Sequence, residues 1–423
     1  MHKIERLLQT LAPKGVEFKT LEEVFEIKNG YTPSKNNPEF WEKGTIPWFR
    51  MEDIRENGRI LKDSIQHITP KALKNKKLFP KNSIIISTTA TIGEHALLIV
   101  DSLANQRFTF LSKKANCDLA LDMKFFFYQC FLLGEWCKNN TNVSGFASVD
   151  MTAFKKYKFP IPPLEIQQEI VKILDAFTEL NTELNTELKA RKKQYQYYQN
   201  MLLDFNGINS NHQDTKEKLA QKTYPKRLKS LLQTLAPKGV EFRKLGEVCD
   251  FQKGKSITKK AVTLGKVPVI SGGRQPAYYH NEANRSGETI AISSSGVYAG
   301  YVSYWDIPVF LADSFSVSPK QKTLMPKYLF HYLTTQQDAI HATKSAGGIP
   351  HVYSKDLQNF LIPIPPLEIQ QEIVKILDQF SILTTDLLAG IPAEIEARKK
   401  QYEYYREKLL SFKPLTLHEE VKK

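Results

Sequence analysis

The chain has 423 residues, of which 41% are hydrophobic and 11% aromatic, and this composition excludes a disordered protein and favours two or more folded domains. Lysine and arginine outnumber aspartate and glutamate by 59 to 45, so a net charge of +14 favours polyanionic partners such as nucleic acid, although a generic basic soluble protein has the same balance. Four cysteines without a CxxC pair argue against a zinc site, and without a signal peptide or a long apolar run the protein is expected to be soluble and cytoplasmic.

Taken in chain order, the sequence predicts two globular domains, each followed by a long helix. Residues 1–160 and 227–363 combine short β-rich runs with clusters of Gly, Pro, Asn and Ser, which is typical of mixed α/β domains. Residues 161–205 and 364–412 are expected to contain the helices, because apolar residues at helical spacing follow a Pro-Pro pair in each. Residues 206–226 are polar and are predicted to be a linker, and residues 413–423 form a C-terminal tail.

Three segments of the chain occur twice, which indicates a molecule of two related halves. They read LLQTLAPKGVEF at Leu7–Phe18 and Leu231–Phe242, IPPLEIQQEIVKILD at Ile161–Asp175 and Ile364–Asp378, and ARKKQY at Ala190–Tyr195 and Ala397–Tyr402. Two copies of roughly 200 residues are too long to be units of a solenoid. Because the sequences between the shared segments differ, we expect two domains that are held alike and recognise different targets.

The two long helices carry the apolar seam of a coiled coil. Apolar residues recur at steps of three and four, and Arg191 and Arg398 each occupy a seam position, where we expect them to set the register or to contact a partner. At 1.5 Å per residue each helix is about 60–70 Å long, and Pro392 is expected to kink the second one. We predict that the helices pair antiparallel with one domain at each end; the alternative is that each lies in the core of a separate compact domain.

A four-residue unit is repeated within the first helix. It reads TELN at Thr178–Asn181 and Thr182–Asn185, and TELK at Thr186–Lys189, so that each unit contributes one leucine to the seam. One unit adds about 6 Å of helix, whereas one base pair adds about 3.4 Å along DNA. Either the units are an amphipathic filler, or their number sets the separation of the two domains.

This arrangement resembles the specificity subunit of type I restriction–modification enzymes. A globular domain, IPPLEIQQEIVKILD, a long helix and ARKKQYxYY occur twice in that order, and the resemblance extends from Leu7 to Phe412. It implies an α+β fold in which two target-recognition domains are joined by two long antiparallel coiled-coil helices, with a pseudo-twofold internal repeat. It also implies a DNA-binding subunit that recognises a bipartite, asymmetric site, with one half-site for each domain.

The same resemblance implies the partners of the chain. Two modification (methyltransferase) subunits are expected to dock on the repeated segments, and restriction (translocase–nuclease) subunits to join through them, without a membrane. No cofactor or metal is expected on this chain, because S-adenosylmethionine, ATP and Mg²⁺ would belong to the partner subunits. The two helical segments differ in length by four residues, so the symmetry is expected to be imperfect.

The motifs agree with a chain that is not itself an enzyme. Gly254-Lys255-Ser256 lacks the first glycine of a phosphate-binding loop, because Cys249 stands at that position. Both Pro-Pro pairs lie in Ile-Pro-Pro-Leu, unlike the (N/D)PP(Y/F) motif of adenine methyltransferases, and no Pro-Asp dipeptide of a PD…(D/E)xK nuclease occurs. Two other interpretations stay open: a DNA-reading component of a fused or related restriction enzyme, and a coiled-coil scaffold without a role on DNA.

DNA-contacting residues are expected in the turn-rich segments, because base edges are read by polar and basic side chains. The candidates in the first domain are Tyr31, Thr32, Arg50, Thr89, Thr91, Gln106, Arg107 and Ser148. The candidates in the second domain are Lys255, Arg274, Gln275, Tyr279, Ser294, Ser295, Tyr298, Ser314 and His351. Gly145–Ser148 aligns with Gly348–His351, so Ser148 and His351 are expected to be equivalent. An ordinary turn or surface role is the alternative for each candidate.

Overall fold

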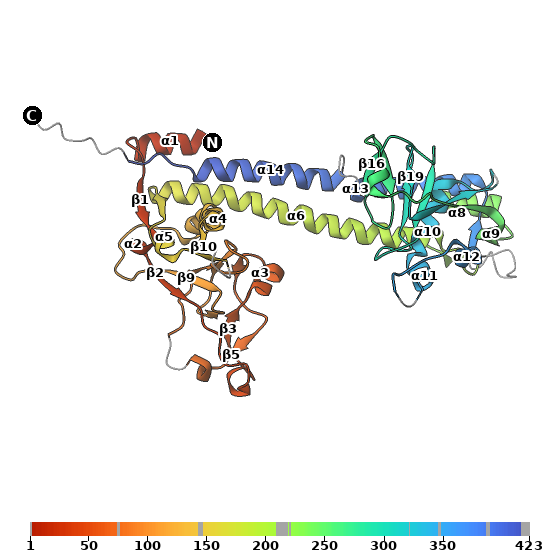
Figure 1. The fold of residues 1–423 in the computed structure, drawn as a ribbon. Helices are drawn as coiled ribbons and strands as arrows, with labels where there is room; N and C mark the ends of the chain where they lie inside the picture. Colours follow the sequence, from red (N-terminus) through yellow and green to blue (C-terminus); the bar gives the residue numbers. More distant parts are fainter. Residues whose placement is uncertain are drawn as a thin grey trace, which may run out of the picture. The chain divides into compact units, whose positions relative to one another are not determined.

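The computed structural model describes residues 2–73, 77–142, 147–208, 219, 221–320, 322–345, 348–385 and 390–415 (Figure 1). The chain divides into two compact units, of which unit 1 comprises Met1–Glu183 and Glu396–Lys423, and unit 2 comprises Leu184–Ile395. Each unit therefore contains one mixed domain together with parts of both helical segments. Among the described residues, no helix is long and apolar enough to cross a membrane.

Unit 1 is built around a five-stranded sheet of order β2-β9-β6-β7-β4 and a three-stranded sheet of order β5-β3-β8. The strands of these sheets are β2 (Phe25–Asn29), β3 (Ile46–Phe49), β4 (Ile60–Leu61), β5 (His67–Ile68), β6 (Ile84–Ser87), β7 (His95–Leu98), β8 (Leu103–Ala104) and β9 (Phe108–Lys113). Strand β6 is apolar on both faces, because Ile84 and Ile86 pack with the helix α4 (Met123–Asn139), whereas Ile85 packs with Phe49 of β3.

The remaining elements of unit 1 surround these sheets. They are α1 (His2–Leu11), β1 (Glu17–Thr20), α2 (Leu21–Val24), η1 (Pro38–Phe40), α3 (Met51–Asn57), η2 (Pro70–Leu73), β10 (Thr141–Asn142), β11 (Ser148–Val149), α5 (Met151–Lys155) and β12 (Lys158–Ile161). Helix α4 begins at a side-chain cap, in which the carboxylate of Asp122 accepts the backbone N–H of Lys124 at 2.7 Å. This cap fixes the start of the helix that covers the sheet.

Unit 2 repeats this topology with a shorter sequence. Its sheets have the orders β14-β20-β17-β18 and β16-β15-β19, and β15 pairs antiparallel with β16 and parallel with β19, as β3 does with β5 and β8. The strands are β14 (Cys249–Lys253), β15 (Val267–Ile270), β16 (Tyr278–His280), β17 (Thr289–Ser293), β18 (Val302–Trp305), β19 (Phe310–Leu311) and β20 (Ser314–Pro319). Two domains with faint sequence correspondence therefore have one fold.

The other elements of unit 2 also have counterparts in unit 1. They are α8 (Lys226–Leu235), β13 (Glu241–Lys244), α9 (Leu245–Val248), η3 (Lys259–Ala261), α10 (Pro326–Thr335), α11 (Gln337–Ala342), α12 (Ser354–Leu357), β21 (Leu361–Ile364) and α13 (Leu367–Thr385). The strand before the domain pairs antiparallel with the strand after it in both units, as β1 with β12 and as β13 with β21. This pairing closes each domain next to the start of its long helix.

A buried glutamine in each shared segment connects the long helix to its domain. Gln167 and Gln370 are both fully buried. The side-chain oxygen of Gln370 accepts the backbone N–H of Met325 at 2.9 Å, and its nitrogen donates to the carbonyl oxygens of Thr323 at 2.8 Å and Pro365 at 2.7 Å. Gln167 makes the same three hydrogen bonds in unit 1, to Asp122, Ala120 and Pro162. The two copies of this repeated segment therefore make the same contacts in the two units.

The aspartate that ends the same shared segment makes a second connection. Asp175 forms an ion pair with Lys124 at 2.6 Å in unit 1, and Asp378 forms one with Lys327 at 2.7 Å in unit 2. The buried His331 also lies 3.0 Å from Asp378. Although burial raises the pKa of Asp378, the hydrogen bonds from His331 and Lys327 hold it below its ordinary value.

The long helices pack against each other within each unit, and their direction is antiparallel. Helix α6 (Leu164–Leu203) begins directly after its Pro-Pro pair, as predicted. In unit 1 Ile170 shares a core with Leu409, whereas Phe177, further along α6, lies 6.2 Å from the ring of Tyr402. Residue numbers therefore increase in opposite directions along α6 and α14 (Gly390–Leu410). In unit 2 the ring of Tyr198 on α6 stacks on Phe380 of α13 at 4.9 Å.

The described part of the second helical segment, predicted over 364–412 with a kink at Pro392, comprises two stretches of helix. The structure describes two helices, α13 and α14, and residues 386–389 between them lie outside the description. Gly390 has a φ of +76°, which is not a right-handed helical conformation. Pro392 is the third residue of α14, where the missing N–H costs no intrahelical hydrogen bond.

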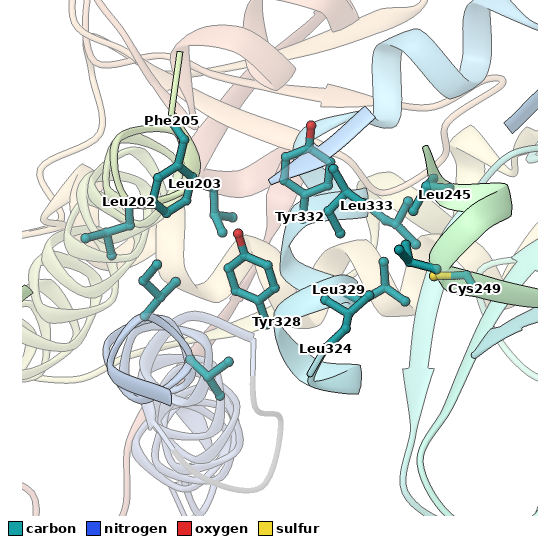
Figure 2. Packing of buried hydrophobic residues seen from close by; sticks show 14 of the residues in the cluster. Leu202, Leu203, Phe205, Leu245, Cys249, Leu324, Tyr328, Leu329, Tyr332 and Leu333 are labelled. Carbon is teal, nitrogen blue, oxygen red and sulfur yellow. The ribbon is translucent and has the colours of Figure 1, made fainter. Parts of the chain in front are cut away.

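The segment 206–226, predicted to be a polar linker, contacts the core of unit 2 through its described residues. Ile208, Leu219 and Tyr224 are buried in the core of unit 2. The hydroxyl of Tyr224 donates to the carbonyl oxygen of Asp204 at 2.6 Å. Figure 2 shows the end of this core, where Leu202, Leu203 and Phe205 lie beside Tyr328 of α10. The few apolar residues of the segment are the ones that anchor it.

The C-terminal part of α14 packs against the domain of unit 1. The guanidinium of Arg406 lies 4.4 Å from the ring centroid of Phe131, which also lies 5.3 Å from the guanidinium of Arg59. The neighbouring His95 is fully buried, and burial together with Arg59 lowers the pKa of His95 to about 3. The backbone after α14 pairs with Val16, whose N–H donates to the carbonyl oxygen of Lys413 at 3.0 Å.

Candidate nucleic-acid interface

Each unit has a surface cavity where the ends of three strands meet. In unit 1 a cavity of about 350 Å³ is lined by Thr32, which follows β2, by Ser87, the last residue of β6, and by Phe108, the first residue of β9. In unit 2 a cavity of about 500 Å³ is lined by Gly254 after β14, Ser294 after β17 and Ser314 at the start of β20. Since β2 corresponds to β14 and β9 to β20, the two cavities overlap in fold position at the start of β9 and β20. Residues of α3 line only the first cavity, and residues 351–355 line only the second.

A glycine brings the chain to each cavity. A Cβ atom on Gly30 would lie 2.3 Å from the carbonyl oxygen of Asn105, and one on Gly254 would lie 2.5 Å from that of Ala312. No larger residue fits at either position without moving backbone, so the close approach requires glycine. In unit 1 this approach places Thr32 on the cavity wall.

The predicted equivalence of Ser148 and His351 is confirmed. Isolated β-bridges join Thr89 to Ser148 in unit 1 and Ser295 to His351 in unit 2. The bridge connects the turn after β6 or β17 with the segment before α5 or α12. Gly145 lies outside the described residues. Sequence alignment of this short segment therefore identified two positions with the same place in the fold.

Cationic side chains predominate in the cavity of unit 1. Its wall includes Lys35, Arg50, Arg55 and Arg107, with Glu52 as the carboxylate among them. Such a concentration of positive charge attracts phosphate groups and raises the local concentration of a polyanion. Guanidinium groups can also donate two hydrogen bonds to one guanine in the major groove.

Arg50 is held in place against the wall of this cavity. Its backbone N–H donates to the carboxylate of the buried Asp53 at 2.6 Å, and its guanidinium carbon lies 6.0 Å from the ring centroid of Trp48. The Nε atom lies 3.8 Å from the carboxylate of Glu52 and makes no hydrogen bond to any described residue. The guanidinium of Arg50 therefore lies between the Trp48 ring and the Glu52 carboxylate and keeps hydrogen-bond donors for a ligand.

The cavity of unit 2 has aromatic groups beside its charges. The ring of Tyr353 stacks on His351 with centroids 6.0 Å apart and an interplanar angle of 17°. The ammonium group of Lys355 lies 5.5 Å from the same ring. Lys253 and Asp313 complete the charged part of the wall. The two cavities therefore overlap in fold position but differ in the chemistry of their walls.

Most of the candidates in the first domain gather at the cavity. Its lining includes Thr32, Arg50, Thr91, Gln106 and Arg107. The hydroxyl of Thr32 donates to the side-chain oxygen of Gln106, so two candidates contact each other directly. Thr89 and Ser148 form the adjoining bridge. Tyr31 is not among the lining residues, and its ring packs against the cluster around Trp48.

The candidates in the second domain are more dispersed. The cavity lining includes Ser294, Ser295, Ser314 and His351, whereas Lys255, Gln275 and Tyr279 are exposed outside it. The hydroxyl of Ser314 points inward, because it is buried and donates to the carbonyl oxygen of Ile270 at 3.1 Å. The guanidinium of Arg274 lies 5.0 Å from the ring centroid of Tyr298 and 5.6 Å from that of Tyr301, which forms a separate exposed group.

Sequence reasoning missed several residues of both cavities. They are Lys35, Arg55, Lys253, Asp313, Tyr353 and Lys355. Lys355 and Tyr353 follow His351 at alternate positions, so extending the alignment at His351 by four residues would have found both. Asp313 precedes Ser314, but no motif identifies it. Within the described parts of the chain, no group of His, Cys, Asp and Glu residues could hold a metal ion.

Comparison with known proteins decides the family. The family model described as type I restriction modification DNA specificity domain matches residues 13–194 and 237–397. The chain is 40% identical over 402 residues to the type I restriction enzyme EcoprrI specificity subunit of Escherichia coli, covering 92% of this chain and 93% of that protein. The chain belongs to the type I restriction–modification specificity subunits. The interpretation as a recognition subunit, in preference to an enzyme, is thereby confirmed.

Two further specificity subunits are similar to this one. The EcoR124I/EcoR124II specificity subunit of Escherichia coli is 33% identical over 314 residues, which cover 66% of this chain and 70% of that protein. The crystal structure of the type I restriction-modification system S subunit from M. genitalium has a TM-score of 0.54 at 18% identity, covering 93% of this chain and 95% of that chain. The predicted α+β fold with two repeated domains and long helices is that of the specificity subunits.

Proposed function

We propose that this specificity subunit reads a bipartite site in double-stranded DNA, with one half-site for each of its two cavities. The observation that carries the proposal is that two domains of one topology place cavities at the same strand ends and line them with different side chains. Two domains of the same fold can bind the same kind of ligand, duplex DNA, and cavity walls with different side chains can recognise different bases. An asymmetric recognition sequence follows from this difference.

We propose that the partners of the chain are methyltransferase subunits. They dock on the repeated segments, here called the frame, one at each copy. Three pairs of equivalent large apolar residues are exposed in both copies: Leu11 and Leu235, Leu164 and Leu367, and Tyr197 and Tyr404. Exposed apolar and aromatic side chains are common in protein interfaces. Because each exposed residue occurs twice with the same identity, the frame fits two copies of one partner. Restriction subunits would join through these, and S-adenosylmethionine, ATP and Mg²⁺ would bind to the partners.

Methylation mapping tests the DNA-reading proposal. The chain is co-expressed with the methyltransferase subunit of its own restriction–modification system, and methylated adenine is mapped across the host genome. One split motif is expected. Replacing residues 19–159 by the matching segment of another specificity subunit should change one half of that motif only. A change in both halves would contradict the assignment of one half-site to each domain.

The docking proposal is tested through the stoichiometry of the complex. Tyr197 is 58% exposed and Tyr404 is 59% exposed, so serine at either position removes interface area without opening a core. Tyr197→Ser and Tyr404→Ser should each reduce the number of tightly bound methyltransferase subunits from two to one, as measured by native mass spectrometry. Tyr279→Ser is the matched control, because Tyr279 is 52% exposed within a recognition domain. Unchanged stoichiometry in the double variant would refute docking at these tyrosines.

A further inference from the structure

The residues that enter the last strand of the central sheet are equivalent in the two units. The carbonyl oxygen of Arg107 accepts the N–H of Thr88 at 3.2 Å, and that of Asp313 accepts the N–H of Ser294 at 2.9 Å. Thr88 and Ser294 each follow the central strand, β6 or β17, directly. Arg107 lines the cavity of unit 1, and Asp313 lines that of unit 2. Arg107 and Asp313 therefore occupy equivalent positions in unit 1 and unit 2.

The two side chains at this position have opposite hydrogen-bonding chemistry. Arginine only donates hydrogen bonds, and an ionised aspartate only accepts them. Both side chains are exposed, and neither forms an ion pair within the described residues. The hydroxyl of Ser271 donates to one carboxylate oxygen of Asp313 at 3.0 Å, which orients the carboxylate.

A neighbouring position also has an arginine in unit 1 and a different residue type in unit 2. The carbonyl oxygen of Phe49 accepts the N–H of Asn105 at 3.1 Å, and that of Ile270 accepts the N–H of Ala312 at 2.8 Å, so the residues that follow, Arg50 and Ser271, are also equivalent. Unit 1 therefore has two arginines at this part of the wall, whereas unit 2 has a serine that supports a carboxylate.

A carboxylate at this place is informative because it opposes the binding of a polyanion. A carboxylate is repelled by phosphate groups, whereas the ammonium groups of the surrounding Lys253 and Lys355 attract them. Opposite a base edge, a carboxylate accepts a hydrogen bond from the exocyclic amino group of cytosine, as arginine donates two to guanine. An oriented carboxylate in a basic cavity thus fits a base-reading role.

We propose that Asp313 reads a cytosine amino group in the second half-site, and that Arg107, at the equivalent position, reads a guanine in the first. Ser271 acts as a positioning residue for Asp313. This inference rests on the proposed function, because it specifies the bases that the two cavities discriminate. The asymmetry of the recognition sequence would then come in part from one position of the fold.

The inference is tested in the complex with the methyltransferase subunit. Asp313→Ala should relax one position of the second half-site, with discrimination at that position falling roughly 10- to 100-fold, and leave the first half-site unchanged. Asp313→Asn should shift the preference at that position toward adenine, because an amide offers one donor and one acceptor. Arg107→Ala should relax one position of the first half-site only. Methylated adenine mapping and competition binding with single-base variants of the duplex measure these effects.

Two further variants separate base reading from a general charge effect. Asp306→Asn removes an exposed carboxylate elsewhere in unit 2 and should leave the motif unchanged. Ser271→Ala keeps the carboxylate but removes its orienting hydrogen bond, so discrimination at the same position should fall, and Ser271→Thr should restore it. Asp306 and Asp313 are exposed and Ser271 is partly exposed, so none of these substitutions opens a buried core.

The outcomes are distinguishable. If Asp313→Asn and Asp313→Ala tighten binding equally to all duplexes and leave the motif unchanged, Asp313 is a surface charge and the inference fails. If either variant changes both half-sites, or if the wild-type complex methylates no split motif, the proposed function fails instead.

Discussion

Replacing the buried Gln370 by leucine should destabilise unit 2 strongly, because this side chain satisfies three backbone groups at once. Its oxygen accepts the N–H of Met325 at 2.9 Å, and its nitrogen donates to the carbonyl oxygens of Thr323 and Pro365 at 2.8 and 2.7 Å. Leucine has a similar volume but no hydrogen-bonding group, so all three backbone groups lose their partner in a site without solvent.

The expected loss follows from the number of groups left unsatisfied. Each buried backbone group without a partner costs about 1–3 kcal/mol, and three of them together should cost about 3–6 kcal/mol once the relaxation of the site is included. Domains of this size have a free energy of unfolding of about 5–15 kcal/mol. The melting temperature of unit 2 should fall by roughly 6–24 °C.

Thermal unfolding and amide hydrogen exchange measure this effect. Exchange should accelerate around Met325 at the start of α10 and much less in unit 1. The neighbouring Gln371 provides a matched control, because it is the same residue type on the same helix with an exposed side chain, and Gln371→Leu should leave stability within about 0.5 kcal/mol. Gln167→Leu should have the corresponding effect in unit 1. Equal melting of the Gln370→Leu and Gln371→Leu proteins would refute the argument.

Four other outcomes are expected. Deleting Thr182–Asn185 shortens α6 by about 6 Å and should shorten the unspecified spacer between the two half-sites by one or two base pairs. An unaltered spacer with full activity would show that the length of α6 does not set the distance between the half-sites. If Arg274 contacts guanine, Arg274→Ala should cost about 1–3 kcal/mol of binding free energy and relax specificity at one base position. If it contacts a phosphate, binding to all duplexes should weaken, and the slope of log K against log salt concentration should decrease in size by about one. If neither the specificity nor the slope changes, Arg274 is not part of the interface. Because burial and Arg59 lower the pKa of His95 from 6.5 to about 3, the unfolded chain takes up a proton below pH 6.5 that the folded chain excludes, so the free energy of unfolding decreases as the pH is lowered below 6.5. Between pH 7 and 5 this component is about 2 kcal/mol in urea unfolding, and His95→Phe should abolish it; an identical pH dependence in the variant would contradict the assignment. The purified chain without partners should show no methyltransferase, ATPase or nuclease turnover.

Several features of the fold follow from the sequence alone, because they depend on local patterns. The Pro-Pro pairs predicted the helix starts, since a first helical turn tolerates missing N–H groups, and α6 and α13 begin directly after them. The repeated segments predicted two equivalent halves. The seam predicted that the helices pack on each other, because a one-sided apolar stripe must be covered. The turn-rich segments supplied five of the residues that line the cavity of unit 1.

Other features depended on contacts between residues far apart in the sequence. The two domains share a topology that their sequences barely reveal, because a strand requires only buried or alternating apolar residues and many sequences satisfy that. Ser314 is a polar residue in a turn-rich segment, and only its hydrogen bond to Ile270 shows that it faces the interior. The equivalence of Arg107 and Asp313 is likewise invisible in the sequence. It is defined by the backbone hydrogen bonds to Thr88 and Ser294, which depend on how the strands pair and not on which side chains they carry.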